Sequence, residues 1–111
     1  MPDTSSNPLA ELFPRPSDAT REYRRDDLLQ RARLVQTNGW APYQAVWSTG
    51  EVVGVAALLN DIDTLSAIQE TLQTAWARWA FDLWGMADGH ADVDDGCRET
   101  RRWFITAAQQ L

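Results

Sequence analysis

The sequence predicts a mainly α-helical protein, with three long helices in a small orthogonal bundle and a short insert at about residues 43–58. Three segments, about 18–37, 63–85 and 93–111, repeat apolar residues at the three- and four-residue spacing of an amphipathic helix. Hydrophobic residues make up 44% and charged residues 23% of the 111 positions, which is typical of a globular chain of one domain. We therefore expect one core that is built from helices.

The first 17 residues are expected to form an N-terminal tail before a single helical domain over 18–111, because proline recurs through them. The prolines are Pro2, Pro8, Pro14 and Pro16. Within the tail, Leu9, Leu12 and Phe13 fall on one side of a single helical turn. We expect these three side chains to contact the chain's own domain or a partner, which makes them candidate binding residues.

The first helix is expected to begin at Ser17 or Asp18, both good N-caps, and to end near Thr37 before an Asn-Gly pair. Its apolar stripe consists of Leu28, Ala32 and Val35. The arginines on the same side, one to two turns earlier, are Arg21, Arg24 and Arg25. The favoured interpretation is that these arginines lie over the edge of the core with their charges in water. The alternative is that they meet acidic groups of this chain or of a partner.

The insert contains the segment QAVW-STGE-VVGV, whose valines and aromatic residues favour two short strands around a Ser-Thr-Gly turn. From Gly54 onward, alanine and leucine favour a helix instead. We expect a small β-hairpin that leads into a helical turn.

The second long helix is expected to begin at Asp61 or Asp63 and to end at Gly85 and Gly89. Its core stripe consists of Leu65, Ile68, Leu72, Trp76, Trp79 and Leu83. Two further aromatic residues, Phe81 and Trp84, fall outside the stripe, on the side where water is expected. Since exposed aromatic residues are common binding hot spots, both are candidate binding residues.

The last helix is expected over about 93–111, with Asp92 as its N-cap and acidic residues in its first turn. Its apolar stripe consists of Val93, Cys97, Phe104, Ala107, Ala108 and Leu111. Because Cys97 lies on this stripe, we expect a small buried hydrophobe rather than a nucleophile.

The acidic stretch around His90 does not match the spacing of a known metal site. A calcium-binding loop that begins at Asp88 would place His90 at position 3 and Val93 at position 6, where an oxygen ligand and a glycine are needed. One histidine and one cysteine also fall short of the four ligands of a structural zinc site. We therefore expect no metal, no cofactor and no catalytic residue.

The charge of the chain is negative overall and unevenly distributed. Its net charge of −6 argues against nonspecific binding to nucleic acid, which requires positive surface. Residues 15–33 contain six arginines and four acids, whereas residues 51–95 contain nine acids and one arginine. No apolar run reaches the roughly 18 residues of a membrane-spanning helix. With a single cysteine and no basic, apolar leader at the start, the expected location is the cytoplasm.

Two stretches, TNGW…W-STGEVVGVAALLND and FDLWGMADGHADVDDGCRETRRWF, resemble a small actinobacterial and phage-borne family of domains of unknown function. The resemblance covers about residues 28–108, and Trp40 and Trp84 are the positions that match. The chain departs from the family pattern at Val53, Ala56 and Gly85. The resemblance implies an origin in an actinobacterium or a phage, and it implies no activity.

The leading hypothesis is a non-enzymatic, protein-binding helical module, an accessory protein of a phage or mobile element. Self-association is the simplest partner hypothesis, with the arginine face of the first helix against the acidic 51–95 segment of a second copy in a homodimer. One alternative is an acidic decoy that inhibits a nucleic-acid-binding protein, which requires its carboxylates to share one surface. The other is a small metal-dependent enzyme that uses His90 and nearby aspartates.

Overall fold

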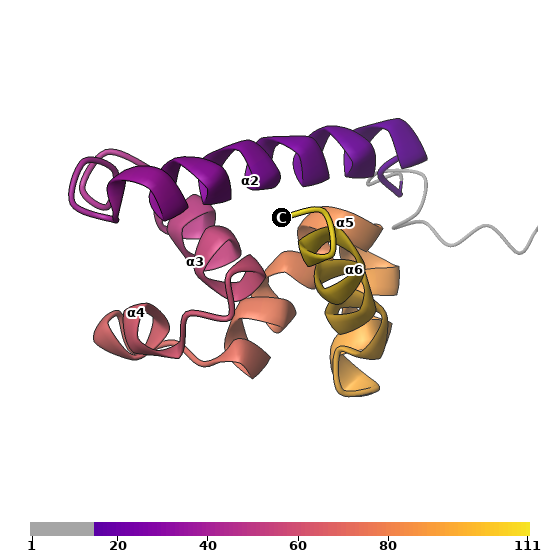
Figure 1. Cartoon of the computed structure of the whole chain (residues 1–111). Coiled ribbons are helices and arrows are strands. Elements are labelled where there is room, and N and C mark those ends of the chain that lie inside the picture. Colours follow the sequence, from indigo (N-terminus) through magenta and orange to yellow (C-terminus); the bar gives the residue numbers. More distant parts are fainter. Residues whose placement is uncertain (1–14) are drawn as a thin grey trace, which may run out of the picture.

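The structure is a computed structural model, and it describes residues 15–111. These residues form five helices and no strand, so the prediction of a mainly α-helical fold is confirmed (Figure 1). The helices are α2 (Asp18–Asn38), α3 (Thr49–Leu58), α4 (Ile62–Ala67), α5 (Leu72–Asp94) and α6 (Arg98–Ala108). Leu9, Leu12 and Phe13 lie outside the described residues.

The first helix, α2, has the predicted bounds to within a residue. The hydroxyl of Ser17 accepts a hydrogen bond from the backbone N–H of Thr20, as an N-cap does. At the other end Gly39 takes a φ of 76°, and its N–H bonds to the carbonyl of Val35. Figure 1 shows α2 lying across the other helices along one side of the domain.

The predicted β-hairpin is wrong, because the segment from Thr49 forms α3. Ser48 and Glu51 make a capping box: the N–H of Glu51 bonds to Ser48 Oγ (3.2 Å), and the N–H of Ser48 bonds to Glu51 Oε1 (2.9 Å). All seven residues from Val52 to Leu58 are buried. A helix that is apolar on every side must be covered on every side, and α3 packs against α2, α4, α5 and α6. The valines are therefore core residues of a central helix.

The predicted single helix from residue 63 is interrupted near its start. The short helix α4 ends at Ala67, with Ile68 as its C-cap, and Gln69 takes a left-handed φ of 61°. A new helix, α5, then begins at the N-cap Thr71, whose hydroxyl accepts from the N–H of Thr74 at 3.1 Å. The apolar stripe expected on one helix is thus divided between two.

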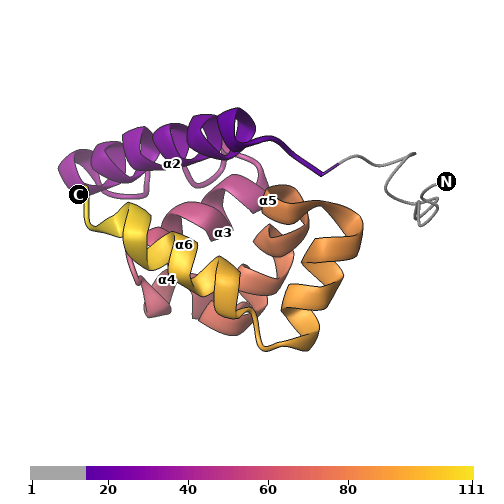
Figure 2. The ribbon, with the colours of Figure 1, turned by 90° about the vertical axis from the view of Figure 1, so that its right-hand side faces the viewer.

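The helical geometry breaks at Gly85, as predicted, but Gly89 lies within a second helical arm rather than at a helix end. At Gly85 (φ 88°, ψ 179°) the chain bends sharply, and it then resumes the helix as far as Asp94. Gly89 is buried against the first arm, where an added Cβ would lie 2.9 Å from the carbonyl oxygen of Ala80. Figure 2 shows the two arms of α5 and the second arm running toward the start of α6.

The last helix begins at Arg98 rather than near residue 93, because a turn with left-handed Cys97 (φ 62°) separates it from α5. Asp92 is therefore not its N-cap, although its carboxylate still reaches the start of α6. Cys97 is fully buried, as expected. The inward side of α6 presents Phe104 and Ala107 to the core.

The core joins all five helices around α3. Its largest members are Leu28, Leu29, Leu58, Leu65, Trp79, Leu83 and Phe104. The indole of Trp79 meets the ring of Phe104 edge-on, with ring centroids 6.1 Å apart. Within residues 15–111 no helix has the length and apolar character that would let it cross a membrane.

Candidate interaction site at the bend of α5

The bend at Gly85 places Trp84 beside two arginines. The guanidinium carbon of Arg21 lies 5.1 Å, and that of Arg15 lies 5.6 Å, from the centroid of the Trp84 ring. These distances are within the range of cation–π attraction. Trp84 is half-buried and packs against the core, so the expectation that it faces water is wrong.

The segment Arg15–Pro16 lies directly on the bend. A Cβ at Gly85 would be 3.2 Å from Pro16 Cδ and 3.3 Å from Arg15 Cα, so only glycine leaves room for this close approach. Arg21 holds the arrangement together by donating to the carbonyls of Pro16 (2.7 Å) and Leu83 (3.1 Å). The first described residues of the chain are thereby fixed to α5.

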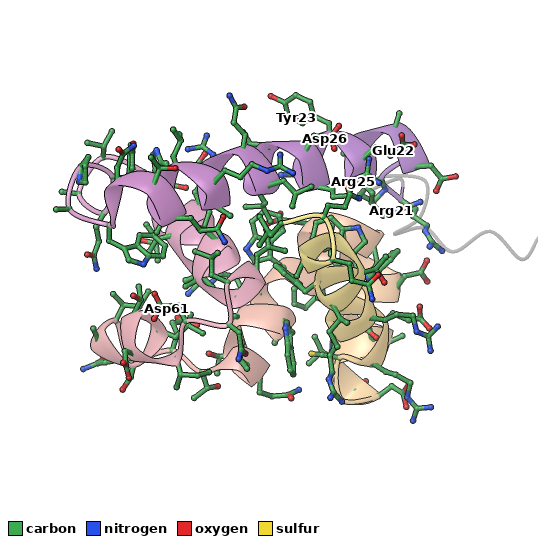
Figure 3. All side chains as sticks on the ribbon, viewed as in Figure 1. Arg21, Glu22, Tyr23, Arg25, Asp26 and Asp61 are labelled. Carbon is green, nitrogen blue, oxygen red and sulfur yellow. The ribbon has the colours of Figure 1, made fainter. Side chains whose placement is uncertain are left out.

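Arg21 therefore has a structural role in place of the expected surface role. Its side chain is only 13% exposed, and it also pairs with Asp18. In Figure 3 Arg21 lies on the side of α2 that faces α5 and α6, whereas Tyr23 points away from them. Arg21 packs against the Trp84 ring, and its low exposure leaves it unavailable to a partner.

A pocket of about 390 Å³ opens next to Trp84. Its lining residues are Arg15, Trp84, Asp88, Ala91, Asp92, Asp95 and Glu99. The lining thus combines an indole ring, four carboxylates and one arginine, and Arg15 Nη1 already lies 3.0 Å from Asp88 Oδ2. We refer to this site as the elbow pocket.

Asp92 forms the inner part of the elbow pocket and is engaged in hydrogen bonds. It is 7% exposed, and it accepts from the N–H of Glu99 (2.9 Å) and from the N–H and hydroxyl of Thr100 (3.1 and 2.5 Å). The same hydroxyl accepts from the indole N–H of Trp84 at 3.0 Å. This chain of bonds caps α6 and fixes the orientation of the indole wall.

The rim of the pocket is less tightly bonded. Asp95 lies 3.6 Å from Arg98 Nε, and Glu99 lies 3.6 Å from Arg102 Nη1. Both distances exceed a hydrogen bond, and both carboxylates are more than half exposed. The rim can therefore accept further hydrogen bonds from a cationic group.

The remaining candidates from the sequence do not join the pocket. Arg25 pairs with Asp26 at 3.2 Å, and Arg24 is half-buried, its Nε without a hydrogen-bond partner in the part of the chain that the structure describes. Phe81 is 36% exposed and lies against Gly89, but it does not line the pocket. Of the candidates that lie within residues 15–111, the structure brings together only Arg21 and Trp84.

Sequence reasoning missed Arg15, Thr100 and Glu99 as parts of the site. Arg15 was placed in the tail, and the other two lie on a helix whose start was predicted five residues too early. The signal present in the sequence was the recurrence of arginine and acid after residue 94, at intervals of three and four residues.

His90 and Cys97 do not form a reactive pair. His90 is exposed on α5, with Nδ1 3.2 Å from Asp94 Oδ2. Burial, and then the negative charge of Asp92, raise the pKa of the Cys97 thiol, which keeps it protonated and unreactive. Among residues 15–111 no three histidine, cysteine or acidic side chains are placed to hold a metal ion.

Three carboxylates of the expected acidic surface have structural partners. The backbone hydrogen bond from Ser48 is the main cause that lowers the pKa of Glu51, which also pairs with Arg31 at 2.9 Å. Burial acts to raise the pKa of Asp61, but bonds from Thr64 and from the Trp40 indole outweigh it and lower that pKa. The hydroxyl of Thr74 and then Arg78 lower the pKa of Glu70. These groups stabilise helix ends and turns.

Comparison of the chain with protein-family models, with curated proteins and with solved structures gave no match. The resemblance to an actinobacterial and phage family, and the origin that it implies, stay predictions.

Proposed function

We propose that this protein is a non-enzymatic, protein-binding helical module, and that its elbow pocket binds an arginine or lysine side chain of a partner protein. The observation that carries the proposal is the lining of the pocket, where a fixed indole ring stands beside three carboxylates that can still accept hydrogen bonds. Such a site offers a cation both a π face and acceptors.

The chain's own arginine supports this chemistry. Arg15 already combines the two contacts, with its guanidinium over Trp84 and its Nη1 on Asp88. The opposite rim, formed by Asp95 and Glu99, carries two further negative charges. A second cation from a partner would neutralise that rim, and the pocket of about 390 Å³ is large enough for one side chain and its solvent.

The acidic decoy has less support in the structure. Glu51, Asp61 and Glu70 are held by capping hydrogen bonds and ion pairs within the chain. Carboxylates with such partners offer a poor imitation of a phosphate backbone, because part of their charge and of their hydrogen-bonding capacity is already engaged within the chain.

The test is binding of a short Gly/Ser peptide that carries one arginine, followed by NMR on the indole N–H of Trp84. That signal is assigned as the one lost in Trp84→Phe. We expect the arginine peptide to shift it in a saturable manner, and the matched citrulline peptide, which has the same shape without the charge, to leave it unchanged.

Two double variants with equal loss of charge provide the control. Asp95→Asn with Glu99→Gln should weaken binding of the arginine peptide, whereas Asp63→Asn with Asp82→Asn should not, since these lie outside the pocket. Equal binding of the citrulline peptide, or equal loss in both double variants, would overturn the proposal.

A further inference from the structure

The outward side of α6 carries an ordered series of opposite charges. Arg98 and Glu99 lie four and three residues before Arg102, so these three share one face of α6. Asp95 precedes the turn at Gly96 and Cys97, and its Oδ2 lies 3.6 Å from Arg98 Nε at the start of that face. The side chains of all four are between 56% and 69% exposed. Figure 2 shows α6 crossing the front of the domain with no helix in front of it. We call these four residues the α6 seam.

The charges of the α6 seam are poorly paired within the chain. Asp95 and Arg98, and likewise Glu99 and Arg102, are 3.6 Å apart. Every other arginine–carboxylate pair of residues 15–111 is 3.2 Å or shorter. Four exposed charges thus remain within reach of each other without a hydrogen bond, on a surface that no other part of the described chain covers.

We propose that the α6 seam binds the α6 seam of a second copy, with the two helices antiparallel about a two-fold axis. In the register centred between Arg98 and Glu99, Asp95 faces the partner's Arg102 and Glu99 faces the partner's Arg98. The two-fold axis repeats both pairs, so the interface closes on itself and a dimer is the end product. The order of charges on the α6 seam is therefore complementary to the same seam on a second copy.

The surroundings of the seam favour the same occupant. Ile105, one turn beyond it, is 50% exposed and lies at the edge of a groove that contains Trp76, so the helix pair would also cover apolar surface. Arg101 lies over the Trp76 ring at 5.8 Å, on the flank of the seam. The net charge of −6 on each copy opposes association, so the dimer is expected to be weak and to depend on these local pairs.

This inference rests on the proposed role in protein binding and shares Asp95 and Glu99 with the rim of the elbow pocket. It replaces Arg21 and Arg25 of α2, which are paired within the chain, with the arginines of α6 as the basic half of the dimer contact. The experiment below therefore reads dimerisation and arginine binding separately.

The test is sedimentation velocity of the full chain over a concentration series, with two charge-reversal variants. Arg98→Glu with Arg102→Glu makes the seam wholly acidic, and Asp95→Arg with Glu99→Arg makes it wholly basic. We expect the wild type to dimerise and each variant alone to stay monomeric. A mixture of equal parts should again form dimers, because the reversed seams complement one another.

Circular dichroism and urea unfolding establish that both variants fold, and only folded variants are compared. A wild type that is monomeric at all concentrations, variants that dimerise like the wild type, or a mixture that stays monomeric would each overturn the inference.

Binding of the arginine peptide is measured on the Arg98→Glu, Arg102→Glu variant, which keeps the rim carboxylates. If that peptide binds while the wild type is monomeric, the inference fails and the proposed function stands. If the wild type dimerises but the peptide does not bind, the elbow pocket fails instead.

Discussion

Three carboxylates around α3 and α4 differ from the two that form the rim of the elbow pocket. Glu51, Asp61 and Glu70 each accept at least two hydrogen bonds or ion pairs of 3.2 Å or shorter. Among the described residues, Asp95 and Glu99 have only partners at 3.6 Å. Aspartate and glutamate stabilise the fold where they accept short bonds from the same chain, and they remain available for binding where such bonds are missing. This difference is the reason why the proposed binding site lies in the α5–α6 half of the domain.

The largest effect is expected in the α3 half, from Gly54→Ala. A Cβ on Gly54 would lie 2.6 Å from Cζ2 and 2.8 Å from Nε1 of Trp79, which is 5% exposed and bonded to the carbonyl of Gly50. The indole cannot move without losing that bond, so we expect a loss of about 3 kcal/mol in the free energy of unfolding. Urea unfolding followed by circular dichroism measures it.

Gly50→Ala is the matched control, because a Cβ there meets nothing within 4 Å. It should be neutral or slightly stabilising, since alanine favours a helix. If the two substitutions have equal effects, α3 is not packed against Trp79 as the structure shows.

The next largest effect is expected in the α5–α6 half, from Asp92→Asn. The amide can still accept from the N–H of Glu99, but its NH₂ group would face the N–H of Thr100, which then has no acceptor. We expect about 2 kcal/mol of lost stability. Hydrogen exchange should also show faster opening at the start of α6. The exposed Asp94→Asn serves as control, and a similar loss there would show that Asp92 has no special role.

Much of the helical architecture could be predicted from local signals. Ser17 and the Asn38-Gly39 pair define α2 because caps act over three or four residues. The capping box of Ser48 and Glu51 also defined α3, but the β propensity of the valines obscured it. The propensity of a residue in a central helix is overridden by burial, which depends on the other helices.

The candidate site could be predicted only in part. Trp84 and Arg21 were identified by their positions on helix faces, and they do meet. The pocket itself depends on long-range placement, because Gly85 ends the first arm and the second arm lies against the first where Gly89 packs on Ala80 and Phe81. Arg15 and Thr100 enter the site only through that bend, so no local pattern could place them there.

A smaller effect is expected at the start of α3, where Glu51 makes the stability of the fold depend on pH. The N–H of Ser48 and the charge of Arg31 lower the pKa of Glu51 in the folded state below its ordinary value of 4.5. A lowered folded pKa contributes stability that is complete above the ordinary value and is lost as the pH falls through the folded value. The difference in unfolding free energy between wild type and Glu51→Gln should therefore shrink on acidification below pH 4.5.

The measurement is urea unfolding of both proteins across the acidic range. Glu22→Gln is the control, because Glu22 is exposed on α2. A difference between wild type and Glu51→Gln that does not change with pH would show that the capping box contributes no charge-dependent stability.

The smallest effect on stability is expected from Arg15→Gln. This variant is also the most direct test of the elbow pocket. Arg15 is 55% exposed, and its pair with Asp88 competes with any cation that a partner brings to the elbow pocket. An exposed pair of this kind is worth about 0.2–1 kcal/mol. Its removal should therefore strengthen binding of the arginine peptide by a factor of about 1.4 to 5, with little change in stability.

Arg25→Gln removes the same charge from α2 outside the pocket and should leave binding unchanged. Weaker binding in Arg15→Gln would mean that Arg15 helps to hold the partner. Arg15 would then be part of the binding site and not a group that competes with the partner's cation.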